Sequence, residues 1–268
     1  MQKDFDRLPI TKEALCEALS SVGITENRIR ALAFDSLPST NTLAKEMADE
    51  RIPTLIVANG QTGGRGRMGR SFACPDGAGV YMSLLIYPHL ATGEVSRLTC
   101  LAAVAAARAI ERLSGIGPSI KWVNDLYVRD KKLAGILTEG KATADGGLEY
   151  AVIGIGINLF PSDLGEYSDI ATDVVSAGGR PTKRVELIAE ILRELLPMTE
   201  SNDYPALFAE YKARAAFIKE KRVLVTVGAD RYFATVLDIE DDGRLKILTE
   251  EGKVLSLGSG EVSLSLKM

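Results

Sequence analysis

The chain has 268 residues, of which 46% are hydrophobic and 25% charged, and its formal net charge is −4. This length and apolar content are typical of a globular protein that buries its own core, and they exclude collagen-like and disordered chains. A general nucleic-acid-binding protein usually carries a basic face, so this balance predicts that any anion site is local. Three cysteines and one histidine are too few for a disulfide framework or a His-rich metal site.

The few scattered cysteines are typical of a protein kept in a reducing compartment. The first residues, MQKDFDRLPITKE, are charged where an export signal would be apolar. The most apolar stretch, 98–110, contains Arg108 and is shorter than the roughly 20 residues that a membrane crossing needs. We therefore expect a soluble, cytoplasmic protein with no membrane partner.

Apolar periodicity and capping residues predict the elements in chain order. We expect helices over 11–22 with Thr11 as N-cap, just after Ser39-Thr40-Asn41, and over 96–113, 185–196 and 205–218. We expect strands over 31–36, 55–58, 80–87, 119–128, 132–139 and 149–159, with a glycine-rich loop over 60–69. From residue 222 onward, short strands alternate with Gly/Asp turns, a pattern that predicts a small SH3-like β-barrel packed on the main domain.

The glycine-rich loop, GQTGGRGRMGR over 60–70, is the first candidate site. Residues 51–75 contain four arginines and no acidic residue. Clustered glycines let backbone N–H groups converge on an anion, and arginines donate bidentate hydrogen bonds to phosphate or carboxylate. The alternative is a flexible, solvated surface loop. GRGRMG has the letters of a dinucleotide-binding fingerprint, but no helix can open in the SFACPDGAG that follows, and the P-loop pattern is absent.

The strand EYAVIGIGIN over 149–158 is the second candidate. Because side chains alternate along a strand, Ile153, Ile155 and Ile157 share one face, and Gly154, Gly156 and Asn158 share the other. Two glycines on one face indicate close approach by a ligand or another backbone. The alternative is that a helix packs against this bare face.

The third candidate is KWVND over 121–125, followed by KLAGIL over 132–137. A tight turn between these segments would bring Lys121, Asn124, Asp125 and Lys132 close together. Surface hairpins are often charged, so Lys121 is more simply explained as a solvated residue. Lys132 begins a strand, and Gly135 three residues later leaves space beside it.

These motifs occur in a fixed order: STN (39–41), GRGRMGR (64–70), KWVND (121–125), KLAGIL (132–137) and GIGIN (154–158). Together they resemble the biotin–protein ligase family, also called biotin–[acetyl-CoA-carboxylase] ligases. The resemblance implies an α/β (α+β) catalytic domain over 1–220, with a mixed β-sheet flanked by helices and a short helical segment over 1–30. The SH3-like domain would cover 221–268.

The resemblance implies that biotin and ATP react to biotinyl-5′-adenylate and pyrophosphate, and that the biotinyl group then passes to a lysine of the biotin carboxyl carrier protein of acetyl-CoA carboxylase. Mg²⁺ is implied by the ATP chemistry, although the sequence shows no dedicated metal site. The implied catalytic residues are Arg67, Lys132 and Asp125. The implied binding residues are Ser39, Thr40, Asn41, Gln61, Gly64, Arg65, Gly66, Arg67, Arg70, Phe72, Lys132, Gly135, Leu137, Gly154, Gly156 and Asn158.

The chain departs from the family pattern at two positions and at its N-terminus. Val123 stands where the family usually has proline, and Phe72 stands at its usual tryptophan position. About 34 residues precede the first expected strand, with one helix and no helix-turn-helix. We therefore expect a ligase with no DNA-binding repressor activity.

Two other functions fit parts of the pattern. A lipoate–protein ligase shares the fold and the acyl-adenylate chemistry, but the arginine-containing loop and KWVND match the biotin branch better. A non-catalytic binder of biotin or nucleotide would not need both Lys132 and three arginines. Exposed edge strands are compatible with a homodimer or with docking of the carrier protein.

Overall fold

Seven strands form one mixed sheet in this computed structural model, which describes residues 7–201, 205–258 and 261–264. The strands are β1 (Arg30–Leu37), β2 (Thr54–Gln61), β3 (Gly79–Ile86), β4 (Ser119–Lys121), β5 (Asp125–Val128), β6 (Lys131–Ala142) and β7 (Leu148–Asn158), in the spatial order β1-β2-β3-β7-β6-β5-β4. β1 and β2 are parallel and the other neighbours are antiparallel. The expected mixed sheet is confirmed.

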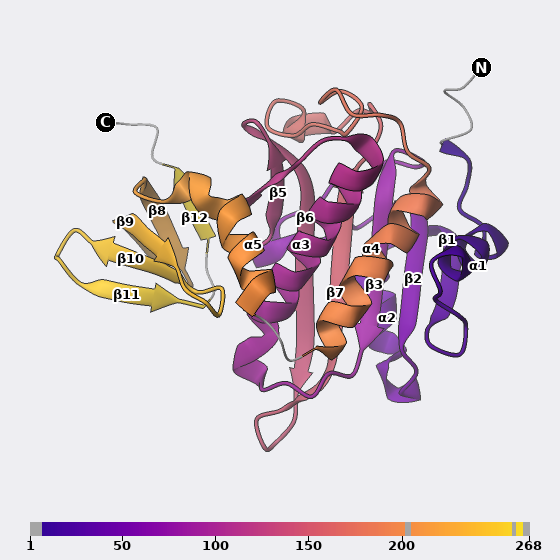
Figure 1. The fold of residues 1–268 in the computed structure, drawn as a ribbon, viewed down its shortest axis with the longest axis horizontal. Helices are drawn as coiled ribbons and strands as arrows, with labels where there is room; N and C mark the ends of the chain where they lie inside the picture. Colours follow the sequence, from indigo (N-terminus) through magenta and orange to yellow (C-terminus); the bar gives the residue numbers. More distant parts are fainter. Residues whose placement is uncertain (1–6, 202–204, 259–260, 265–268) are drawn as a thin grey trace.

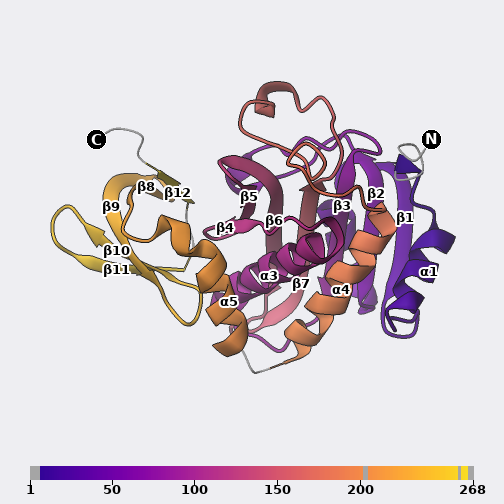
Figure 2. The same cartoon turned by 45° about the horizontal axis from the view of Figure 1, so that its top comes forward.

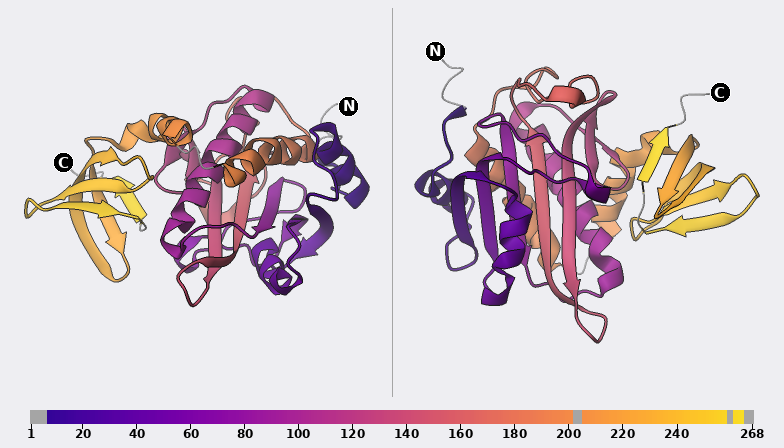
Figure 3. Two further views of the ribbon diagram at one scale, coloured as in Figure 1. Left: turned by 60° about the horizontal axis from the view of Figure 1, so that its bottom comes forward. Right: turned by 180° about the vertical axis from the view of Figure 1, so that it is seen from behind.

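Helices cover both faces of this sheet (Figures 1 and 3). On one face lie α3 (Val95–Ser114) and α4 (Arg184–Glu200), with α1 (Lys12–Ser21) beside β1 and α5 (Pro205–Ala215) beside α3. The short α2 (Thr40–Glu46) lies on the other face. Short 3₁₀ turns are η2 (Ala48–Glu50), η3 (Arg67–Gly69), η4 (Thr92–Glu94), η5 (Gly165–Tyr167) and η6 (Ala216–Ile218). The short α2 therefore covers only part of its face of the sheet (Figure 3).

The two expected N-caps are present. The hydroxyl of Thr11 accepts a hydrogen bond from the backbone N–H of Ala14, and that of Ser39 accepts one from Thr42. Each hydroxyl thereby pairs with a backbone N–H group of the first helical turn that has no partner within the helix. The Ser39 cap fixes where α2 begins, and this places Thr40 and Asn41 at the end of the helix that lies over the sheet.

The segment 119–128, expected as one strand, is a hairpin: β4 and β5 pair antiparallel, with Lys121 opposite Asp125. The prediction of a single strand was wrong because distant residues hold the turn between them. The Tyr211 hydroxyl donates to the carbonyl of Val123, and the Trp122 indole donates to that of Gly243. The peptide bond between Trp122 and Val123 is cis.

The C-terminal strands form a separate antiparallel sheet (Figure 2). They are β8 (Arg222–Val227), β9 (Asp230–Ile239), β10 (Leu245–Thr249), β11 (Val254–Leu257) and β12 (Glu261–Leu264), in the order β11-β10-β9-β8-β12. This confirms the expected small all-β unit. The expected boundary between 220 and 221 stays a prediction. Among the described residues, we find no helix with both the length and the apolarity to span a membrane.

Candidate active site

The bare face of β7 forms the floor of a pocket. A Cβ on Gly154 would collide with the Asn41 side chain, and a Cβ on Gly156 would lie 2.7 Å from the Phe72 ring. Ile153, Ile155 and Ile157 pack into the core on the opposite face. The glycines therefore leave room for the side chains of Asn41 and Phe72 at the sheet surface, as the alternation predicts. Asn41 belongs to α2, so the alternative of helix packing holds at Gly154, whereas Phe72 at Gly156 comes from the segment after the loop.

Polar groups line one end of this pocket. The backbone N–H of Thr40 donates to Gln61 Oε1 at 2.7 Å, and Asn41 Nδ2 donates to the carbonyl of Leu137 at 3.2 Å. Ser83 Oγ, on β3, lies 2.7 Å from Thr40 Oγ1 and 2.6 Å from Asn41 Oδ1. Thr40, Asn41 and Ser83 are all buried. These groups form an array of hydrogen-bonding atoms beside the apolar residues Met82 and Leu137 in the pocket lining.

Arginines from the loop close over the pocket. Arg65 and Arg67 line it, and Arg67 Nη1 donates to Asn124 Oδ1 at 3.2 Å. The loop folds back on itself, because the N–H of Gly66 donates to the carbonyl of Arg70 at 2.7 Å. Gly64 passes so close to the Phe72 carbonyl and the Cys74 thiol that a side chain would not fit. The loop therefore lies beside the pocket, with Arg65, Gly66 and Arg67 in its lining.

A second cavity of about 380 Å³ adjoins the first. The two share five lining residues: Gly66, Arg67, Phe72, Asn124 and Lys132. Beyond these, the second cavity is lined by the cations Arg70 and Lys121 and by the polar residues Asp125 and Asn158. Its remaining wall comes from the segment after β7 and contains Leu164, Tyr167, Ile170 and Ala171. Two ligands bound in these cavities would meet at Lys132 and Arg67.

Lys132 lies where the cavities join. Its Nζ is 2.7 Å from Asp125 Oδ1, and Asn124 Nδ2 donates to the same oxygen at 3.0 Å. The ammonium also lies 5.9 Å from the centre of the Phe72 ring. The hairpin predicted from KWVND and KLAGIL therefore holds one cation and one carboxylate in contact at the boundary between two cavities.

Cys74, close to the loop, is not a reactive thiol. Burial raises its pKa to about 12, although the Gln61 side chain, whose Nε2 lies 3.0 Å from Sγ, opposes this shift. A thiol of this pKa stays protonated at neutral pH and is a poor nucleophile. Cys74 is therefore not a candidate catalytic nucleophile.

Almost all of the residues proposed from the sequence line one of the two cavities. The first contains Ser39, Thr40, Asn41, Gln61, Arg65, Gly66, Arg67, Phe72, Lys132, Gly135, Leu137, Gly154 and Gly156. The second contains Arg70, Asp125 and Asn158. Gly64 lies in the loop but lines neither cavity. The roles of these residues stay predictions.

Sequence reasoning did not find Ser83, Glu139 or the segment from Leu164 to Ala171. No local pattern marks Ser83, which lies within an apolar strand. Glu139 could have been found, because it follows Gly135 and Leu137 on the same face of β6. The 164–171 segment joins the site through an isolated parallel bridge between Lys132 and Ala171, which no short-range signal indicates.

The site therefore consists of two adjoining cavities that share Arg67 and Lys132, and comparison with known families shows the class of protein to which it belongs. The biotin/lipoate A/B protein ligase family matches residues 33–158, and the biotin protein ligase C-terminal domain matches residues 220–265. The chain belongs to the biotin/lipoate A/B protein ligase family.

Individual relatives cover most of the chain. It is 36% identical over 246 residues to the bifunctional ligase/repressor BirA of Bacillus subtilis, which covers 86% of this chain and 72% of that protein. It is 28% identical to the biotin–[acetyl-CoA-carboxylase] ligase of Mycobacterium tuberculosis, over 97% of this chain and 98% of the relative. The solved biotin protein ligase of Aquifex aeolicus in complex with biotin and ATP is 26% identical, with a TM-score of 0.71 over 88% of this chain and 98% of that one.

Proposed function

We propose that the protein is a biotin–[acetyl-CoA-carboxylase] ligase, which activates biotin with ATP and passes it to a lysine of a biotin carboxyl carrier protein. The observation that carries this proposal is the junction of two cavities at Lys132 and Arg67. The relatives and the solved neighbours are biotin protein ligases, which favours biotin over lipoate as the acid.

In the first step, biotin lies in the pocket above Gly154 and Gly156, with its carboxylate toward Lys132, and ATP lies in the second cavity. A carboxylate oxygen attacks the α-phosphorus, the bond to the bridging oxygen of pyrophosphate breaks, and pyrophosphate takes that electron pair. Two anions must approach each other, and fixed cations lower the repulsion and stabilise charge on the phosphoryl oxygens. Lys132 and Arg67 supply these cations, and Arg65 and Arg70 extend the positive region over the two cavities.

In the second step, the acceptor lysine attacks the acyl carbon of the adenylate, and AMP leaves with the bonding electrons of the acyl–oxygen bond. The attacking amine must be neutral. Asp125 lines the second cavity and is the carboxylate that orients the incoming amine or accepts its proton. Until then Lys132 and Asn124 hold this carboxylate in place.

Mg²⁺ would accompany the phosphates of ATP. Protein sites usually hold Mg²⁺ through one or two carboxylates together with substrate phosphates, and Asp125 lines the cavity assigned to ATP. In the ranges 7–201, 205–258 and 261–264, no group of three or more His, Cys, Asp and Glu side chains is placed to hold a metal ion. The residues present therefore fit an ion that is bound mainly by the nucleotide. We also propose a cytoplasmic location and self-association through an edge strand.

Incubation with α-labelled ATP and either biotin or lipoate tests the proposal. We expect labelled adenylate retained on the protein and release of pyrophosphate with biotin. Addition of the carrier protein should then discharge the adenylate as AMP. Adenylate formed only with lipoate would assign the chain to the lipoate branch, and no adenylate with either acid would contradict an enzymatic function.

A further inference from the structure

Tyr211 on α5 is a buried phenol that belongs to none of the sequence motifs. Its hydroxyl donates a hydrogen bond to the carbonyl of Val123 at 3.0 Å, across 88 residues of sequence. Burial raises the pKa of Tyr211 well above its ordinary value of 10, so the hydroxyl keeps its proton. A hydroxyl has one hydrogen to donate, and here that hydrogen goes to the hairpin between β4 and β5.

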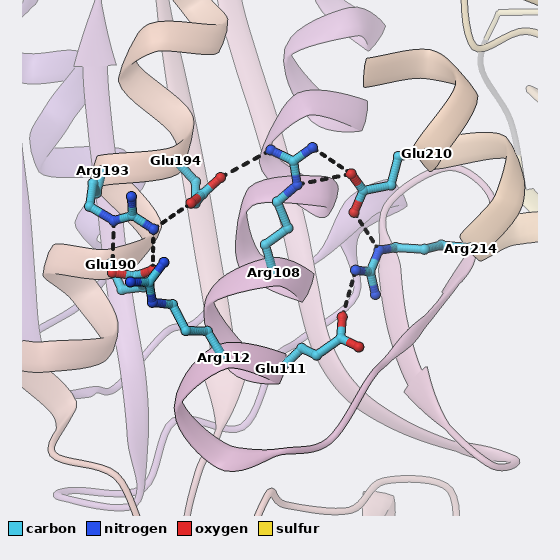
Figure 4. A network of polar contacts seen from close by, with 8 residues as sticks. All are labelled: Arg108, Glu111, Arg112, Glu190, Arg193, Glu194, Glu210 and Arg214. Carbon is cyan, nitrogen blue, oxygen red and sulfur yellow. Dashed lines mark hydrogen bonds and ion pairs between the residues drawn. The ribbon is translucent and has the colours of Figure 1, made fainter. Parts of the chain in front are cut away.

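Ion pairs fix the position of α5, and with it the position of this phenol. Glu210, the residue before Tyr211, accepts a hydrogen bond from Arg108 on α3 at 2.9 Å and another from Arg214 at 2.9 Å (Figure 4). Arg214 also donates to Glu111 on α3 at 2.7 Å. Because α5 cannot shift along α3 without breaking these contacts, the Tyr211 hydroxyl is a fixed point beside the hairpin.

The hydrogen bond to Val123 also fixes the backbone of Asn124. The Val123 carbonyl and the Asn124 N–H belong to one planar peptide unit, so the direction of the carbonyl sets the direction in which the chain enters Asn124. On its other side, Asn124 pairs twice with β6. Its backbone carbonyl accepts from the N–H of Ile136 at 2.9 Å, and its Nδ2 donates to the Ile136 carbonyl at 3.0 Å. Asn124 is therefore held between α5 and β6.

The side chain of Asn124 connects the loop to the reacting groups, and its partners define its orientation. Its NH₂ group donates to the Ile136 carbonyl and, at 3.0 Å, to Asp125 Oδ1, the oxygen that Lys132 also contacts. Its Oδ1 accepts from Arg67 Nη1 at 3.2 Å, and a guanidinium can only donate. A displaced Asn124 would therefore move the loop cation and the carboxylate together.

We propose that Tyr211 is a positioning residue for both steps of the reaction, because its hydroxyl holds Asn124 and thereby Arg67 and Asp125. Tyr211 is not among the residues that line the two cavities, so its effect passes through the hairpin. The inference rests on the proposed function, since it takes Arg67 and Asp125 to act on biotin, ATP and the adenylate.

Tyr211→Phe tests the inference, because it keeps the ring and leaves the Val123 carbonyl without its donor. We expect kcat to fall about tenfold to a hundredfold, since a small displacement of reacting groups costs this much. The KM for biotin should stay within about twofold, because the groups from α2, β2 and β3 at the polar end of the first cavity stay in place. Steady-state kinetics with purified carrier protein measure both quantities.

Tyr87→Phe is the matched control. The Tyr87 hydroxyl donates to the carbonyl of Ala48 at 2.9 Å, so this variant also loses one hydrogen bond from a phenol to a backbone carbonyl, beyond the end of α2. Both variants should unfold at a temperature about 2–4 °C below that of the wild-type protein. Only Tyr211→Phe should lose activity, and kcat of Tyr87→Phe should stay within about twofold.

A double-mutant cycle shows whether Tyr211 acts through Asn124. In an Asn124→Ala protein the connection is already broken, so adding Tyr211→Phe should lower kcat by less than about threefold. A further loss as large as in the wild-type background would overturn the inference, because the phenol would then act by another route.

An unchanged kcat in Tyr211→Phe would also overturn the inference. So would equal losses of kcat in Tyr211→Phe and Tyr87→Phe, because a general loss of stability would then explain both. These outcomes leave the proposed function intact, since the wild-type protein still forms the biotin adenylate. A wild-type protein that forms none would overturn both.

Discussion

The indole N–H of Trp122 donates a 2.9 Å hydrogen bond to the carbonyl of Gly243, across 121 residues of sequence. Trp122 is next to the turn that carries Asn124 and Asp125, whereas Gly243 lies in the turn between β9 and β10. The Tyr211 hydroxyl supports the same hairpin through the Val123 carbonyl, at 3.0 Å. The turn between β9 and β10 and helix α5 therefore both hold the β4–β5 hairpin in place through hydrogen bonds.

Gly243→Ala should destabilise the protein, because the turn that holds Gly243 is tightly packed. Gly243 has φ +84°, and a Cβ there would lie 2.9 Å from both Cys100 Sγ and the Phe208 ring. We expect the free energy of unfolding to fall by about 2–4 kcal/mol in denaturant titrations, because backbone strain and overpacking add. Gly252→Ala, with φ +79° and open space, is the control and should lose only about 1 kcal/mol. Equal losses would show that the packing at Gly243 is unimportant.

Lys132→Ala should abolish most of the adenylation activity. Removal of one preorganised donor to a developing negative charge usually lowers kcat by about 100- to 1000-fold. Pyrophosphate release in single-turnover experiments measures this step. Lys141→Ala, which removes an exposed lysine further along β6, serves as the control. A loss below about tenfold would exclude Lys132 as the main cation of the first step.

Asp125→Asn should separate the two steps. Asparagine can keep the contact with Asn124 but cannot take a proton from the acceptor amine. We expect transfer from preformed adenylate to fall by about 100-fold or more, and adenylate formation by much less. The two rates are measured separately, with labelled biotin and purified carrier protein. An equal fall in both rates would contradict a role in the transfer step, and would indicate that Asp125 only positions Lys132.

Arg67→Gly should weaken retention of the adenylate. Arg67 lines both cavities and bonds Asn124, so it connects the loop to the hairpin beside the reacting groups. We expect labelled adenylate to dissociate about tenfold to a hundredfold faster, as for loss of a charged hydrogen bond. A filter-binding chase measures this rate. Retention as tight as in the wild-type protein would contradict the assignment of the loop.

A network of four arginines and four glutamates joins α3, α4 and α5 (Figure 4). Arg108 on α3 donates to Glu194 on α4 at 3.0 Å and to Glu210 on α5 at 2.9 Å. Glu210 also accepts from Arg214 at 2.9 Å. Burial raises the pKa of Glu210, but the hydrogen bonds from Arg108 and Arg214 lower it below its ordinary 4.5.

Because the pKa of Glu210 is lower in the folded state than in the unfolded state, it stabilises the fold above pH 4.5. This contribution is lost as the pH falls through the folded-state pKa. Arg108→Met should therefore lower the free energy of unfolding by about 1 kcal/mol at neutral pH, and the difference from wild type should shrink in acid. Denaturant titrations across this pH range measure it, with Glu17→Gln, at an exposed position of α1, as the control. A difference that is constant with pH would contradict an electrostatic origin.

The sequence by itself determined the elements whose signals are local. Thr11 and Ser39 marked two helix starts because a cap needs only the next turn of backbone. The glycines at 154 and 156 marked the pocket floor because alternation along a strand requires no other segment. The order of the motifs indicated the family, and it predicted most of the residues that line the two cavities.

Only the tertiary structure decided which distant groups meet. Ser83 and Glu139 join Asn41 because three strands and a helix bring them together, and the turn at Val123 exists because Tyr211 and Gly243 hold it. Such contacts depend on how layers pack and on strand register, where a shift of one residue would reverse every face. A local pattern shows that one face of a strand carries only glycines or that a helix has an N-cap. Which distant side chain lies against that face is decided by the packing of the whole fold.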